Sequence, residues 1–131
     1  MIIVSIPEKW RCVFADKEYK KGETIEICEY ITIPQAQIEM LKNTVVNDYW
    51  FGLNWDQWDA QLLLWTWSLF NHSREPNMTP VFEKETLRVG FVALKDIENG
   101  DELVFDYGYT PRFREMWPAK IVRKLPASAI S

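Results

Sequence analysis

The sequence predicts one domain that is mainly β with short helices, and three observations predict it. Isoleucine recurs with a period of two along residues 25–33, the pattern of a half-buried strand. Residues 87–94 form a second run rich in β-branched and apolar side chains. Segments 15–25 and 93–103 share the pattern Ala-x-Lys-x-apolar-x-x-Gly-acid-x-aliphatic. In each segment a strand end, a turn that needs glycine and the start of another strand follow in order.

The remaining elements are predicted from local signals. Residues 1–7 are apolar and lack both a basic leader and a cleavage site, so they predict a strand rather than a signal peptide. Pro34 ends the first long strand, and residues 35–41 are compatible with a short helix. Residues 56–70 are the best candidate for a long helix, with Asp56 as a possible N-cap.

Residues 71–80 are expected to be irregular, because asparagine, serine and two prolines interrupt regular structure there. The repeated pattern of segments 15–25 and 93–103 has two interpretations. It is either a chance similarity of two turns or a pseudo-duplicated β fold. In the second case, two hairpin units pair around an inserted helical segment.

Composition excludes several classes of protein. Apolar residues make up 47% of the 131-residue chain and aromatic residues 15%, which indicates a globular domain rather than a disordered one. Five of the seven tryptophans lie in residues 50–67, either in a core or in the wall of a cleft. No apolar stretch of about 18 residues is present, so no membrane span is expected. Cys12, Cys28 and a single histidine do not predict a metal site, and reduced thiols indicate a cytoplasmic protein.

The charge is distributed unevenly. Residues 1–110 carry 10 lysines and arginines against 18 aspartates and glutamates, a net charge of −8. Residues 111–131 carry a net charge of +4, and this tail could fold back on the acidic body. An acidic body favours a basic protein or peptide as partner and argues against nucleic acid as the main partner.

Two motifs carry a resemblance to a known family. Asn71-His72-Ser73-Arg74-Glu75-Pro76-Asn77 is followed, about 25 residues later, by Gly100-Asp101-Glu102-Leu103-Val104-Phe105-Asp106-Tyr107-Gly108. Together with Val13-Phe14-Ala15 and Lys21-Gly22-Glu23, they resemble the SET domain of protein-lysine methyltransferases, in its minimal viral and bacterial form. The resemblance covers residues 1–117 as the SET domain and leaves 118–131 as a C-terminal tail. It implies a β-clip-like fold whose C-terminal segment threads against the first motif in a knot-like arrangement.

The resemblance also implies an activity and a cofactor. SET enzymes transfer a methyl group from S-adenosyl-L-methionine to a lysine amine, for example of a histone. Such an in-line displacement at a carbon activated by a sulfonium needs alignment, a neutral amine and oriented dipoles rather than a metal. Tyr107 resembles the family's catalytic tyrosine, although a tyrosine at a strand end could also simply pack on the core.

The resemblance assigns further residues to the site. Asn71 and His72 resemble the pair that holds the cofactor, although a lone histidine is more often structural. The other residues that the resemblance places at the cofactor are Arg11, Cys12, Val13, Tyr49 and Trp117. Phe105, Tyr109 and Phe113 are expected to line the substrate channel, and Phe113 and Trp117 could equally be hydrophobic anchors for the tail. Phe105 is expected to face away from Tyr107; in some relatives a residue at this position influences how many methyl groups are added.

The chain departs from the family pattern in two places. In the segment that leads to Asn71, relatives often carry small residues, whereas this chain has Trp65-Thr66-Trp67. Relatives carry Gly-x-Gly before Val-Phe-Ala, whereas this chain has Trp10-Arg11-Cys12. The alternative function is therefore a catalytically weak or inactive SET-like module that binds a basic peptide. Some minimal relatives dimerise, so a homodimer is possible. A viral or secreted effector protein of this type could act in a host nucleus.

Overall fold

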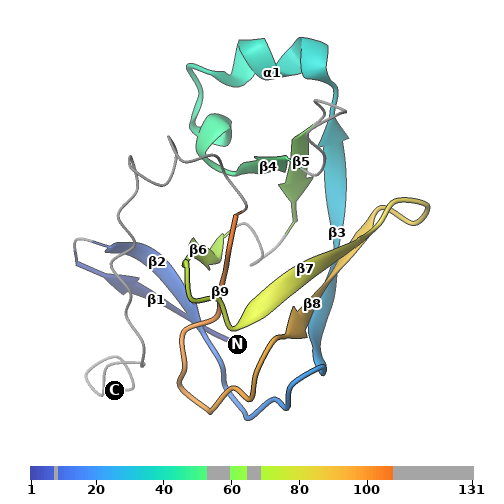
Figure 1. The fold of residues 1–131 in the computed structure, drawn as a ribbon. Helices are drawn as coiled ribbons and strands as arrows, with labels where there is room; N and C mark the ends of the chain where they lie inside the picture. Colours follow the sequence, from blue (N-terminus) through green and yellow to red (C-terminus); the bar gives the residue numbers. More distant parts are fainter. Residues whose placement is uncertain (8, 53–59, 65–68, 108–131) are drawn as a thin grey trace.

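The computed structural model describes residues 1–7, 9–52, 60–64 and 69–107. This part of the chain folds into three small sheets with one short helix and one 3-10 helix (Figure 1). The mainly β fold with short helices that the sequence predicts is confirmed. None of the helices in these residues is long and apolar enough to cross a membrane.

The N-terminal hairpin forms the first sheet. Strands β1 (Ile2–Ile6) and β2 (Lys9–Phe14) pair antiparallel, with Val4 opposite Cys12. The strand predicted at the N-terminus is therefore confirmed. Residues 12–15 are buried, so the second strand of this hairpin enters the core near its end.

The second sheet has five strands in the order β4-β5-β3-β8-β7. Their bounds are β4 Trp50–Gly52, β5 Ala60–Leu63, β3 Thr24–Ile33, β8 Arg88–Ala93 and β7 Met78–Glu83. The strands expected at residues 25–33 and 87–94 are both present. β3 is the long central strand, because it pairs with β8 through its first half and with β5 through its last four residues.

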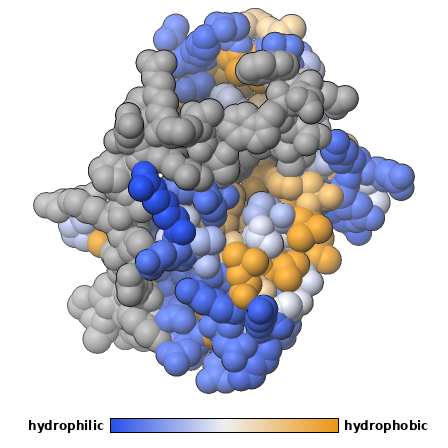
Figure 2. Space-filling model, in the orientation of Figure 1, coloured by the Kyte–Doolittle hydropathy of each residue, from blue (hydrophilic) through white to orange (hydrophobic). Residues whose placement is uncertain are grey.

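The sheet leaves some apolar side chains exposed. Ile27 and Ile31 on β3 and Val81 on β7 are each more than half exposed. Figure 2 shows hydrophobic side chains gathered near the middle of one face, in the region of β7 and β8, with hydrophilic side chains around them. The sheet therefore presents part of its apolar surface to solvent.

The short helix is also confirmed. α1 spans Gln35–Leu41 directly after Pro34, which sits at the N-cap, and the 3-10 helix η1 follows at Val45–Asp48. Proline suits this position because its fixed φ and missing N–H cost nothing before the first turn of a helix. Together these helices link β3 to β4.

The long helix predicted for residues 56–70 is wrong where the structure describes it. Ala60–Leu63 is strand β5, with Leu63 opposite Tyr30 of β3 and Leu62 opposite Trp50 of β4. Sheet partners on both sides satisfy its backbone groups, so tertiary pairing overrides the helical preference of its leucines. Asp56 and all of the clustered tryptophans except Trp50 lie outside the described residues.

The irregular segment expected at residues 71–80 is only partly confirmed. Residues 73–77 are irregular, but Asn71–His72 forms strand β6 and Met78 begins β7. Pro80 is tolerated in β7 because β7 is an edge strand of its sheet.

The two repeated segments lie together as a pseudo-symmetric pair. The N–H of Ala15 donates to the carbonyl of Asp101, and the N–H of the matching Ala93 donates to the carbonyl of Glu23. Tyr19 and Ile97, which also match, exchange both of their backbone hydrogen bonds. Gly22 and Gly100 have φ values of 86° and 87° at equivalent turns. The pseudo-duplicated β fold is thus the correct interpretation of the repeat.

A row of aromatic rings connects the sheet to the rest of the core. Phe91 of β8 contacts Phe70 and Phe105 edge-on, with ring centroids 5.0 and 5.3 Å apart, and all three side chains are buried. Phe70 precedes the first motif and Phe105 lies in the second. The core therefore holds both motifs against the same sheet.

Candidate functional site

The two motifs meet as a short parallel strand pair. β6 (Asn71–His72) pairs with β9 (Val104–Phe105), with Asn71 opposite Val104 and His72 opposite Phe105 (Figure 1). The N–H of Ser73 extends the pairing with a 3.1 Å bond to the carbonyl of Phe105. The prediction that these two stretches come together is confirmed by this register.

Asn77 fixes the crossing of the two motifs. Its Nδ2 donates to the backbone carbonyl of Glu102 at 2.7 Å, and its Oδ1 accepts the N–H of Val104 at 3.0 Å. The N–H of Asn77 also donates to the carbonyl of Val104. Both ends of the buried Asn77 amide are therefore hydrogen-bonded to the backbone of the second motif. These bonds take the place of backbone hydrogen bonds that a regular strand would make.

Tyr107 is held by the backbone carbonyl of Phe70 and by the side chain of His72. Its hydroxyl donates a short hydrogen bond to the carbonyl of Phe70, and its N–H donates to His72 Nδ1 at 3.1 Å. Its ring lies against His72, with centroids 5.2 Å apart. Both ends of Tyr107 are therefore positioned by residues 70–72, about 35 positions earlier in the chain.

Phe105 lies beside Tyr107, so the expectation that it faces away is wrong. The two ring centroids are 4.8 Å apart. Residues two apart on a strand share a face, and this explains the contact. Phe105 is buried, and its ring contacts the rings of both Tyr107 and Phe91. It therefore connects the tyrosine to the core.

His72 Nδ1 lies beside two groups of the second motif. It accepts the N–H of Tyr107 at 3.1 Å. The carboxylate of Asp106 lies 3.7 Å from the same nitrogen. His72 thus positions the backbone of Tyr107.

Asn71 connects the first motif to the N-terminal hairpin. Its Nδ2 lies 3.1 Å from the carbonyl oxygen of Arg11, 3.4 Å from Cys12 Sγ and 3.0 Å from Glu102 Oε1. One amide nitrogen therefore joins β2, β6 and the segment that leads into β9.

The missing glycines of residues 10–12 do not strain the chain. These residues lie within β2, where extended torsions suit any side chain. Among the described residues, Leu87 is the only non-glycine with a positive φ. The Cys12 side chain is fully buried beside Asn71, so it does not project outward into the space that glycine would leave open.

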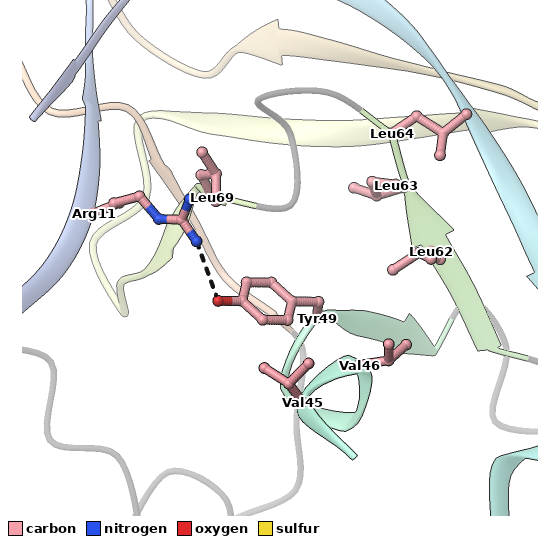
Figure 3. A pocket seen from close by; sticks show the side chains of 8 residues that line it. All are labelled: Arg11, Val45, Val46, Tyr49, Leu62, Leu63, Leu64 and Leu69. Carbon is pink, nitrogen blue, oxygen red and sulfur yellow. Dashed lines mark hydrogen bonds between the residues drawn. The ribbon is translucent and has the colours of Figure 1, made fainter. Parts of the chain in front are cut away.

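A cavity of about 370 Å³ lies next to this site. Its walls are apolar except for Arg11 and Tyr49, whose Nη2 and hydroxyl are 3.3 Å apart (Figure 3). Leu69, which precedes the Phe70 carbonyl that Tyr107 binds, also lines it. Its volume is in the range of small-ligand sites. The remaining lining residues are Val45, Val46, Leu62, Leu63 and Leu64.

The structure brings most of the expected site residues together. Asn71, His72, Phe105 and Tyr107 form one cluster, and Arg11 and Tyr49 share the cavity beside it. Val13 is buried, and its carbonyl accepts the N–H of Leu103. This bond joins β2 to the segment that leads into β9. The expected residues Tyr109, Phe113 and Trp117 lie outside the described residues.

Sequence reasoning missed several parts of the site. Val45, Val46 and Leu69 line the cavity, yet no motif marks them in the sequence. The contact of the Glu102 side chain with Asn71 is not marked by any sequence pattern either. Within residues 1–7, 9–52, 60–64 and 69–107, no group of three or more histidine, cysteine, aspartate or glutamate side chains could hold a metal ion.

Comparisons with known proteins agree with this geometry. The SET domain family matches residues 10–108. A histone-lysine N-methyltransferase of Schizosaccharomyces pombe, specific for lysine 37 of histone H3, is 29% identical over 101 residues, which are 76% of this chain and 67% of that protein.

Two solved structures share the fold. One is a Plasmodium falciparum protein assigned as a histone methyltransferase, with a TM-score of 0.64 and 24% identity over 85% of this chain and 95% of that chain. The other is CpSET8 of Cryptosporidium, with a TM-score of 0.62 and 27% identity. The match covers 83% of this chain but 57% of CpSET8.

Proposed function

The chain belongs to the SET domain family, and we propose that it is a protein-lysine N-methyltransferase that uses S-adenosyl-L-methionine and acts on a basic protein. Family membership and the likeness to a histone-lysine N-methyltransferase support lysine methyl transfer as the class of reaction. The cofactor and the basic substrate are the finer parts of the proposal.

The position of Tyr107 is the observation that carries the proposal. Its hydroxyl is fixed on the carbonyl of Phe70, which in the chain lies between Leu69, a residue of the cavity wall, and Asn71, the start of the first motif. A phenol fixed in this way can align an amine and orient a dipole toward it. The surrounding rings of Phe105 and His72 keep the tyrosine in one orientation.

Residues on β2 and β6 fit a bound cofactor. The proposed holders are Asn71 and His72, together with Arg11 and Cys12. The side chain of Cys12, which stands at one of the missing glycines, is buried. When bound, S-adenosyl-L-methionine would supply a methyl group on a positively charged sulfur. This chain's groups would orient that methyl group and exclude water.

The apolar cavity suits the side chain of a lysine. Leucine and valine walls favour the uncharged amine, because burial lowers the pKa of a lysine by penalising its charged form. The Arg11 guanidinium in the same cavity adds a like charge that favours the neutral amine further. An acidic body over residues 1–110 would attract the basic protein that carries this lysine.

A direct test measures binding and transfer together. Purified protein is titrated by calorimetry with S-adenosyl-L-methionine and then incubated with labelled cofactor and a panel of histones and other basic proteins. We expect saturable binding and label on a lysine, located by mass spectrometry. Binding of basic peptides that is indifferent to cofactor, with no label transfer, would instead support the alternative of an inactive SET-like binding module.

A further inference from the structure

The outer face of the sheet carries a row of small and apolar residues that the proposed chemistry does not use. Strands β3, β8 and β7 lie side by side (Figure 1). Ile27 of β3 is opposite Gly90 of β8, and Gly90 is opposite Val81 of β7. The side chains of Ile27 and Val81 are 59% and 54% exposed. An exposed apolar patch of this kind can mark a contact with another protein.

Gly90 leaves a notch beside Ile27. A Cβ added to Gly90 would have Ile27 Cγ1 and Thr24 Cγ2 as its nearest neighbours, each at an ordinary 3.9 Å. The Ile27 side chain therefore lies on the same face as the notch, and no atom crowds the notch itself. The face thus presents a protruding side chain directly beside a gap.

The neighbouring row carries opposite charges on the same two strands. Glu29 of β3 is opposite Arg88 of β8, and each lies two residues along its strand from the Ile27–Gly90 pair. Residues two apart on a strand share a face, so the two rows point the same way. Both charged residues are exposed. In the part of the chain that the structure describes, neither forms an ion pair.

Such a face is complementary to a second copy of itself. Two copies can stack face to face about a twofold axis that runs along the strands, midway between β3 and β8. Each Ile27 then lies over Gly90 of the partner subunit, and each Glu29 lies opposite Arg88 of the partner subunit. We infer that the protein forms a homodimer through this face. Nearly aligned strands are usual where two sheets pack, and a twofold contact requires this self-complementarity.

The position of the axis follows from the exposed apolar side chains. An axis between β8 and β7 would instead place Val81 over Gly90. Ile27 is larger and more exposed than Val81, and β3 continues to Ile31, which is 51% exposed. β7, by contrast, is an edge strand. The axis between β3 and β8 therefore buries more apolar surface.

The charges favour a second copy over a basic segment as the occupant. Residues 111–131 carry a net charge of +4. A basic segment on this face, from the tail or from a substrate, would meet the positive charge of Arg88. A second copy brings a glutamate to that arginine instead. The inference does not rest on the proposed methyl transfer.

Sedimentation velocity tests the dimer. We expect the wild type to change from monomer to dimer between about 5 and 500 μM, because a small sheet contact gives weak association. Ile27→Asp removes the protruding side chain and Gly90→Val fills the notch, so each should raise the dimer Kd about tenfold or more. Circular dichroism checks that both variants fold. A wild type that stays monomeric, or folded variants that dimerise as the wild type does, would overturn the inference.

Charge reversal tests which surfaces meet. Glu29→Arg and Arg88→Glu each place like charges at both ion pairs of their own dimer, so each variant alone should be largely monomeric. Mixing them sets an arginine opposite a glutamate at both pairs, and the mixture should dimerise with a Kd within about threefold of the wild type. Mixing leaves the pairing inside each chain unchanged, so an effect on the fold alone cannot produce this rescue.

Glu83→Arg is the matched control for the reversals. Glu83 also lies opposite Arg88 within the sheet, but on β7, away from the inferred axis. This variant should dimerise as the wild type does. A mixture of Glu29→Arg and Arg88→Glu that stays monomeric, or a loss of dimer in Glu83→Arg, would overturn the inferred contact.

Discussion

At the scale of single residues, the site depends on side chains that hold other groups in place. His72 accepts the Tyr107 N–H, Asn77 bonds both Glu102 and Val104, and the Asn71 amide joins three segments. The side chain of Asn77 is buried, and a buried amide needs hydrogen-bond partners of this kind. The alignment of Tyr107 is therefore a property of the whole polar network.

Cys28 gives a prediction about pH. Burial, with a smaller contribution from the carboxylates of Glu26 and Glu29, raises the pKa of the Cys28 thiol from 9.0 to about 12. Above about pH 9 the unfolded chain loses this proton while the folded chain keeps it, so stability present below that pH is lost as pH rises. We expect the free energy of unfolding to fall between about pH 9 and pH 11, and Cys28→Ala to reduce that fall.

Denaturant titrations at pH 7 and across the alkaline range check this expectation. The two proteins are compared by how steeply the free energy of unfolding falls with pH. This comparison removes the part of the destabilisation by Cys28→Ala that does not depend on pH. Parallel slopes for the wild type and Cys28→Ala would show that the thiol does not carry the alkaline loss. Iodoacetamide should also modify native Cys28 only slowly at pH 8, because the thiolate is the reactive form.

At the scale of elements, the strands with clear alternation were predictable and the paired segments were not. The isoleucines of residues 25–33 predicted strand β3, but their period of two does not match burial. Ile27 and Ile31 are more than half exposed, whereas Cys28 and Tyr30 are buried. β5 shows no such alternation, since three of its four residues are buried. Its strand conformation depends on β3 and β4, which are remote in sequence, so local propensity could not reveal it. The β6–β9 pair has two residues in each strand and is too short to produce a pattern.

The candidate site was predictable to a similar extent. The motif residues came from the sequence, but their contacts depend on the crossing of β6 and β9. The expected orientation of Phe105 was wrong, because residues two apart on a strand share a face. The contact of Glu102 with Asn71 was not predictable, because it follows from packing between segments 31 residues apart. Motif spacing alone carries no information on such distances.

The glycine turns provide a second prediction. At Gly22, φ is +86° and no atom lies within 4 Å of an added Cβ, so only the torsion opposes a side chain. We expect Gly22→Ala to lower the free energy of unfolding by about 1–2 kcal/mol, the cost of a left-handed torsion for an L-residue. Chemical denaturation measures this difference.

Gly90→Ala is the matched control for that substitution. Gly90 lacks a positive φ, and an added Cβ would meet its nearest neighbours at an ordinary 3.9 Å. It should be neutral or slightly stabilising, because alanine reduces the entropy of the unfolded chain. Equal destabilisation by both substitutions would argue against a special role for the left-handed torsion.

At the scale of the whole molecule, the charge distribution predicts that KM for a basic substrate depends on salt concentration. Residues 1–110 carry a net charge of −8, which should speed encounters with a basic protein. We expect KM for a basic substrate to rise several-fold between about 50 and 300 mM salt, while kcat changes less than twofold. Steady-state kinetics at constant pH measure both. A KM that stays constant or falls with salt would contradict this electrostatic attraction.

The central claim is that the crossing of the two motifs places the Tyr107 hydroxyl where methyl transfer occurs. The most direct measurement is the single-turnover rate of methyl transfer to a lysine-containing substrate, compared between the wild type and Tyr107→Phe. This substitution removes one oxygen and its bond to the Phe70 carbonyl while keeping the ring against Phe105 and His72. We predict a rate at least about 100-fold lower, with cofactor Kd changed less than about threefold. An unchanged rate in a folded, cofactor-binding variant would contradict the claim.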